Sequence, residues 1–175
     1  MNNFEYIERL FRRVDELLDD SIVLYMAGGA ALLAHGIVGR ETQDVDVIDP
    51  IDLPADLLCA VDTVAQEFHE IYSWLNAQAA SKEHPLTPGW KKRARPAFQG
   101  KKLSVFTVGR ADLLGMKLAA VLSRLGDDRA DVLAMKPTKE EWEFARRWAR
   151  QYERTPGWAK DIDRLVAALS EKTGG

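Results

Sequence analysis

Two aspartates that stand one residue apart are the strongest candidates for chemistry in this chain. They open the segment Asp44–Ile48, DVDVI, whose alternation of acidic and apolar residues predicts a β-strand. Residues i and i+2 of a strand lie on the same face, so Asp44 and Asp46 should project together while the two valines face the core. Neighbouring carboxylates repel each other, a divalent cation removes that conflict, and oxygen-only ligands favour Mg²⁺ or Mn²⁺ over zinc.

A pair of glycines precedes these aspartates. Gly28 and Gly29 follow the apolar segment Ser21–Ala27, which we expect to be a buried strand, and they precede a short helix that ends at Gly36. Glycine lets the backbone approach a ligand closely, and the first N–H groups of a helix favour an anion. A phosphate site followed by a carboxylate pair indicates a metal-bound polyphosphate. The alternative is an ordinary turn followed by a solvated strand end.

The composition is that of a globular protein. The chain has 175 residues, 46% hydrophobic and 29% charged, which suits one domain with a real core. The net charge of −3 argues that any nucleic-acid contact is a local patch. Cys59 is the only cysteine, and its helical pattern predicts a buried position. With no apolar run of about 20 residues and no signal-peptide core, we expect a cytoplasmic protein.

The elements that must position the aspartates and glycines follow from periodicity. Apolar spacing predicts a first helix over residues 4–18, a long helix over 54–75 and strands near 93–98 and over 103–108. The remainder is helical, with a capping box formed by Thr138 and Glu141. The predicted fold class is α+β, a small mixed β-sheet flanked by helices. We expect one domain over residues 1–136 and a helical C-terminal segment over 137–175.

The glycines and aspartates belong to a longer pattern. The segment GGAALLAHGIVGRETQDVDVID resembles the nucleotidyltransferase motif of the DNA polymerase β superfamily, in which a Gly-Gly or Gly-Ser turn precedes D-x-D on a strand. Its finer form, R-x-T-x-D-x-D after Gly-Gly, resembles a small bacterial branch that includes the AbiEii-type toxins. The segments TPGWKKR and GRADLLGMKLAAVLSRLGDDRADVLAM are similar to further signatures of that branch. The resemblance covers about residues 22–135.

This resemblance implies a fold of the nucleotidyltransferase type and a reaction. The enzyme would move a nucleoside monophosphate from an NTP to an acceptor hydroxyl with Mg²⁺ or Mn²⁺ as cofactor. By position, Gly28 and Gly29 would cradle the triphosphate, and Asp44 and Asp46 would bind the metal.

The resemblance also assigns charged residues on the later helices. Lys117 would reach the phosphates, and Asp131 would act catalytically, serving the acceptor or a second metal. Arg124 lies seven residues after Lys117 and hence on the same helix face, so it either contacts the nucleotide or forms an ion pair with a nearby aspartate.

One departure from the superfamily concerns a third carboxylate. Polymerase-type sites add it on a later strand of the same sheet, but the predicted strand over residues 103–108 contains no acid. Ser104 or Thr107 would then stand in its place. Either Asp128 or Asp131 replaces the carboxylate from the helices, or the general base is missing.

Several polar residues around this motif have supporting roles. Arg40 would contact phosphate or the acceptor, and Thr42 would hydrogen-bond within the loop, so both are nucleotide-binding candidates; the alternative is that they shape the turn. His35 is expected to be structural.

A basic segment precedes the second signature. The stretch KKRARPAFQGKK contains no acidic residue. It is either a patch that binds the acceptor through Lys91, Lys92, Arg93 and Arg95 or a solvated basic loop. Possible acceptors are RNA, tRNA among them, or a protein, and resemblance to the toxins implies a cognate antitoxin protein as partner. The rival function is a non-catalytic nucleotide-binding or protein-interaction module with the same fold.

Overall fold

The structure is a computed structural model that describes residues 4–39, 41–42, 44–77, 86–123, 126–152 and 155–173. The chain divides into two compact units. Unit 1 comprises Met1–Glu83 and Lys91–Val108, and unit 2 comprises His84–Trp90 and Gly109–Gly175. Among the described residues, no helix is both long and apolar enough to span a bilayer.

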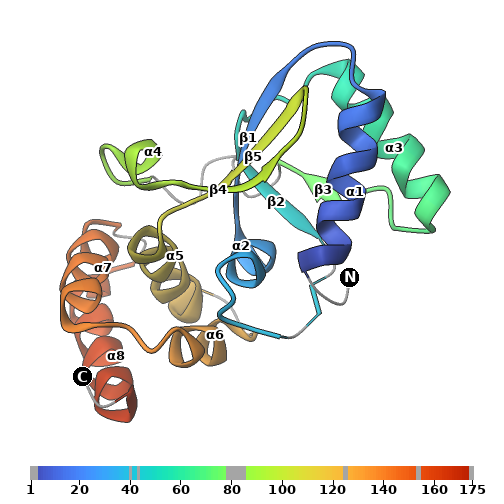
Figure 1. Ribbon diagram of the computed structural model, residues 1–175. Coiled ribbons are helices and arrows are strands. Elements are labelled where there is room, and N and C mark those ends of the chain that lie inside the picture. Colours follow the sequence, from blue (N-terminus) through green and yellow to red (C-terminus); the bar gives the residue numbers. More distant parts are fainter. Residues whose placement is uncertain are drawn as a thin grey trace. The chain divides into compact units, whose positions relative to one another are not determined.

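Unit 1 is built on a mixed sheet, as the sequence predicted. Within the described residues the sheet has five strands in the order β3-β2-β1-β5-β4 (Figure 1). Its strands are β1 (Ile22–Ala27), β2 (Val45–Asp49), β3 (Leu75–Asn76), β4 (Arg95–Gln99) and β5 (Leu103–Thr107). β1 runs parallel to β5 and antiparallel to β2, while β3 runs parallel to β2 and β4 antiparallel to β5.

One face of this sheet forms the core of unit 1. The helices of the unit are α1 (Phe4–Leu17), α2 (Gly28–Ala34), α3 (Ala55–Phe68) and most of α4 (Trp90–Arg93). Alternate strand residues are fully buried on this face, and they pack with the apolar stripes of α1 and α3: Leu24, Met26, Val45, Val47, Leu103, Val105, Ile7, Phe11, Leu57 and Val64. On β1 the alternation leaves Val23, on the opposite face, 46% exposed.

The predicted helix over residues 54–75 is too long. α3 ends at Phe68, because His69 adopts the left-handed conformation at φ 57° and stops the helical hydrogen bonding. The chain then brings Trp74 into the core at 0% exposure, where its indole N–H donates to the Val61 carbonyl at 3.1 Å. Burial of this large ring outweighs the helical periodicity and places β3 beside β2. Cys59, expected to be buried, is exposed on α3.

Asp15 of α1 holds the turn between β4 and β5. Its Oδ1 accepts hydrogen bonds from the backbone N–H groups of Lys102 and Leu103, both at 2.7 Å, and its Oδ2 accepts one from Lys101 at 3.0 Å. A Cβ on Gly100 would lie 2.2 Å from Oδ1, so the carboxylate fits only beside glycine. Burial raises the pKa of Asp15, but these three hydrogen bonds outweigh it and hold the pKa below its ordinary value.

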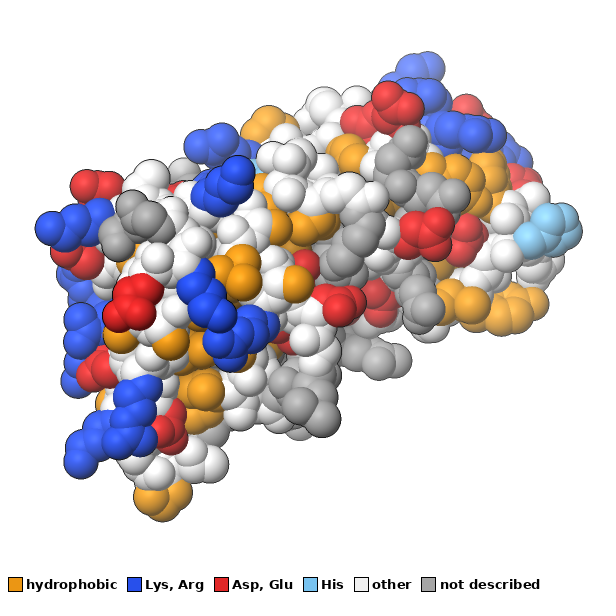
Figure 2. Space-filling view, turned by 90° about the horizontal axis from the view of Figure 1, so that it is seen from below, with side chains coloured by type: hydrophobic (Ala, Val, Ile, Leu, Met, Phe, Trp, Pro, Cys, Tyr) orange, Lys and Arg blue, Asp and Glu red, His pale blue; other side chains and the backbone are white. Residues whose placement is uncertain are grey.

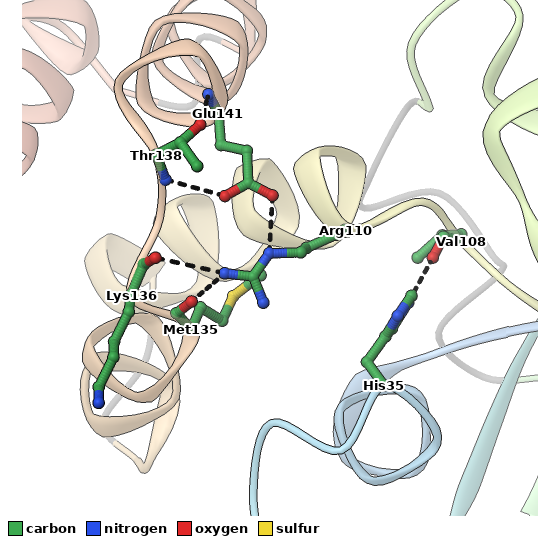
Figure 3. Close-up of polar contacts among 7 residues, drawn as sticks. All are labelled: His35, Val108, Arg110, Met135, Lys136, Thr138 and Glu141. Carbon is green, nitrogen blue, oxygen red and sulfur yellow. Dashed lines mark hydrogen bonds and ion pairs between the residues drawn. The ribbon is translucent and has the colours of Figure 1, made fainter.

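Unit 2 is helical and consists of α5 (Arg110–Ser123), α6 (Asp128–Met135), α7 (Lys139–Gln151) and α8 (Trp158–Thr173) in its described part. The boundary predicted at residue 136 lies inside this unit, between α6 and α7. The predicted capping box is present at the start of α7. Figure 3 shows that Glu141 of this box also accepts from Arg110 Nε at 2.7 Å, while the same guanidinium donates to the Met135 carbonyl. Arg110 therefore ties the start of α5 to the α6–α7 connection.

Candidate active site

The glycine turn packs directly on one of the two predicted metal-binding aspartates. β1 ends at Ala27, which the sheet register pairs with Asp46, and α2 begins at Gly28. Gly28 has φ +69°, and a Cβ there would lie only 2.2 Å from Asp46 Oδ2. Both the conformation and the contact exclude a side chain at this position. The sheet thus brings together the two ends of the motif that the sequence separates.

The second glycine packs in the same way on the loop before β2. A Cβ on Gly29 would lie 2.7 Å from Thr42 Oγ1. Thr42 is only 7% exposed, and its hydroxyl donates within the loop to the Asp44 carbonyl at 3.2 Å. Thr42 therefore fixes the backbone of the first aspartate against the glycine turn.

The two aspartates have the surroundings that a cation ligand needs. β2 begins at Val45, so Asp44 lies one residue before the strand that contains Asp46. Burial alternates as predicted: Val45 and Val47 are fully buried in the core, while Asp44 and Asp46 are half-buried. Ala27 caps α2 without a side-chain hydrogen bond, so the cap offers the first N–H groups of the helix no acceptor. An oxygen-only carboxylate pair beside glycine backbone fits Mg²⁺ with a phosphate ligand.

Sequence reasoning missed Asn76, which lies beside Asp46. β3 borders β2, and the parallel register places Asn76 beside Asp46. β5, where the third position was expected, instead borders β1, and its Thr107 pairs with Met26. The later strand that borders β2 is therefore β3 and not β5. The only local signal was the apolar run IYSWL after the end of α3, which also fits a continued helix.

His35 has the structural role expected of it. Its Nε2 lies 3.0 Å from the Val108 carbonyl oxygen (Figure 3). It also lies 3.0 Å from Thr107 Oγ1. Because a carbonyl only accepts, we assign the ring proton to Nε2, where both oxygens share it. His35 thereby ties the end of α2 to the end of β5.

In unit 2, Lys117 and Asp131 form an ion pair with each other. The Lys117 ammonium lies 2.7 Å from Asp128 Oδ1 and 2.8 Å from Asp131 Oδ2. All three residues are buried, with exposed fractions of 6%, 5% and 1%. A buried ammonium needs such partners because its attraction to them offsets the free-energy cost of removing it from water. Of the other predicted nucleotide ligands, Arg40 and Arg124 lie outside the described residues. In the described part of the chain, no three His, Cys, Asp or Glu side chains form a metal cluster.

Comparison with known families places most of the chain in one family. Residues 3–149 match the model of a family described as a nucleotidyltransferase of unknown function, DUF6036. The chain belongs to this family. The match spans most of both units, so the family includes α5, α6 and most of α7 as well as the sheet. Searches of curated proteins and of solved structures returned no match.

In this nucleotidyltransferase-like chain, the basic residues proposed for the acceptor lie on α4 and β4. Lys91 Nζ lies 2.8 Å from Asp49 Oδ2 and 5.0 Å from the centre of the Tyr25 ring, so its charge is partly satisfied. Lys92 and Arg95 are exposed. On the face shown in Figure 2, Lys and Arg side chains are interspersed with Asp and Glu side chains, which argues against a general coating of nucleic acid on that face.

Proposed function

We propose that this chain is an Mg²⁺-dependent nucleotidyltransferase that moves a nucleoside monophosphate from an NTP to an acceptor hydroxyl. The contact between Gly28 and Asp46 carries the proposal. It places glycine backbone, which a phosphate can approach closely, directly beside a carboxylate that can bind the cation of that phosphate. Membership of a nucleotidyltransferase family supports the reaction class.

In this reaction Asp44 and Asp46 hold Mg²⁺, and the backbone of Gly28 and Gly29 lies along the triphosphate. When bound, Mg²⁺ would supply positive charge for the polyphosphate. The acceptor oxygen forms a bond to the α-phosphorus, and the bond from that phosphorus to the bridging oxygen breaks. Pyrophosphate leaves with the electron pair, and the hydroxyl proton passes to water. The sheet contributes mainly by positioning and by preorganised charge.

The remaining nucleotide ligands are part of the same proposal. Thr42 acts through the loop that it holds, and Arg40 and Arg124 contact phosphate. Lys117 would reach a phosphate with its ammonium, two of whose three N–H donors serve Asp128 and Asp131.

For the acceptor we assign RNA, with tRNA among the candidates, because α4 and the start of β4 present cations that suit phosphate contacts. Its ligands are Lys91, Lys92, Arg93 and Arg95. The resemblance to AbiEii-type toxins supports a toxin role with a cognate antitoxin protein. A protein hydroxyl is the other acceptor to test.

One observation favours the rival function. The residue beside Asp46 on β3 is a neutral amide, and the described residues place no third carboxylate there. A site without that acid suits a non-catalytic module that binds a nucleotide or a protein with the same fold.

Incubation of the chain with labelled NTPs, Mg²⁺ and total RNA separates the two functions. The enzyme transfers label, and the Asp44→Ala and Asp46→Ala variants do not. Asp62→Ala is a matched control, since Asp62 is an exposed acid on α3 in the same unit. Absence of transfer together with absence of Mg²⁺-dependent NTP binding would refute the enzyme.

A further inference from the structure

We infer that Asn76 is the third oxygen ligand of the cation held by Asp44 and Asp46. The inference rests on the proposed function, which supplies the cation, and it concerns only residues of unit 1. It makes the site a set of two carboxylates and one neutral amide.

The sheet register carries this inference. β2 and β3 are parallel neighbours, with Val45 paired to Leu75 and Asp46 paired to Asn76. Paired residues of neighbouring strands project to the same face, and adjacent strands lie about 4.8 Å apart. Val45 and Leu75 enter the core at 0% and 3% exposure. Asp46 and Asn76, each one residue later, therefore share the opposite face.

The position of Asn76 is set by the core and not by a mobile loop. The Val45 N–H donates to the Trp74 carbonyl at 2.6 Å, and the buried Trp74 indole is bonded to α3 through the Val61 carbonyl. β3 is thus anchored on both sides immediately before Asn76. A ligand held this way keeps its place when the cation leaves.

The amide orientation gives Asn76 a ligand atom. Its Nδ2 donates to the Ser73 carbonyl at 3.2 Å, which assigns the nitrogen to that side and leaves Oδ1 as the oxygen turned away from this carbonyl. Amide oxygens are ordinary ligands of hard divalent cations. The three side chains then carry two negative charges, which match one divalent cation.

Charge predicts how the site responds to substitution. An aspartate at position 76 adds a third negative charge and should bind the cation more tightly. An alanine removes an oxygen and should bind it more weakly.

Mn²⁺ affinity of the full chain without nucleotide, followed by electron paramagnetic resonance of free Mn²⁺, tests this response. We expect about tenfold weaker binding for Asn76→Ala and about tenfold tighter binding for Asn76→Asp. Gln66→Ala, an exposed amide on α3, should bind like wild type. Asp46→Asn reports on the proposed function itself: wild-type affinity in this variant overturns the cation site.

If Asp46→Asn weakens Mn²⁺ binding while both Asn76 variants keep wild-type affinity, the role of Asn76 is wrong and the proposed function stands. A measurement on the unaltered chain covers the case in which Asn76→Ala fails to fold. Substoichiometric Mn²⁺ should broaden the side-chain amide NMR signal of Asn76 and spare that of Gln66. An Asn76 signal that stays sharp while Mn²⁺ binds contradicts the inference.

Discussion

Replacing Lys117 by methionine tests whether its ammonium stabilises unit 2 or serves a nucleotide. Methionine preserves an unbranched apolar stem and removes the charge. The loss leaves the carboxylates of Asp128 and Asp131, which are 5% and 1% exposed, without the cation that lies within 2.8 Å of both. Removal of one partner from a buried ion pair costs about 3–5 kcal/mol. For a chain of this size the melting temperature changes by about 2–4 °C per kcal/mol, so we expect a fall of roughly 6–20 °C.

Tryptophan fluorescence during thermal and urea unfolding measures this loss. Trp90, Trp142, Trp148 and Trp158 all belong to unit 2, so the signal reports mainly on the unit that contains Lys117. Lys160→Met removes an exposed charge from α8 and should stay within about 0.5 kcal/mol of wild type.

A compensating variant separates charge from packing. Adding Asp128→Asn and Asp131→Asn to Lys117→Met removes the unpaired charges, so it should recover part of the lost stability. The stabilising role is refuted if Lys117→Met unfolds like Lys160→Met. Loss of Mg²⁺-dependent NTP binding in that same stable variant would instead assign the ammonium to phosphate.

Two further substitutions follow from contacts in unit 1. Gly28→Ala forces a Cβ to within 2.2 Å of Asp46 Oδ2 at a left-handed φ. It should weaken Mn²⁺ binding at least tenfold, whereas Gly39→Ala, with open space around it, should not; equal affinities of the two would contradict the packing argument. Asp15→Asn loses the charged acceptor of three backbone N–H groups and should cost about 1–3 kcal/mol in urea unfolding at pH 7. Because folding lowers the pKa of Asp15, its stabilisation is present above the unfolded pKa of about 4 and is lost as pH falls through the lower folded value. The difference between wild type and Asp15→Asn should therefore shrink at low pH, and a constant difference would contradict this.

Local patterns in the sequence were enough to predict much of the fold. The alternation at DVDVI placed Val45 and Val47 in the core, and the capping box at Thr138 formed because its partners are three residues apart. The Gly-Gly turn and D-x-D also indicated a nucleotidyltransferase-like protein, which the family match confirmed. These features depend on neighbours along the chain, whose geometry is set by the strand and helix periods.

The tertiary structure decided which distant residues meet. Only the strand order shows that Gly28 packs on Asp46. It also shows that Asn76 lies beside Asp46, although the two are thirty residues apart in the sequence. Likewise, the resemblance assigned Lys117 to the phosphates, but its partners Asp128 and Asp131 come from the packing of α6 on α5. Such contacts depend on register and on burial of large side chains such as Trp74, and the free energy of both comes from the whole core and not from any short segment.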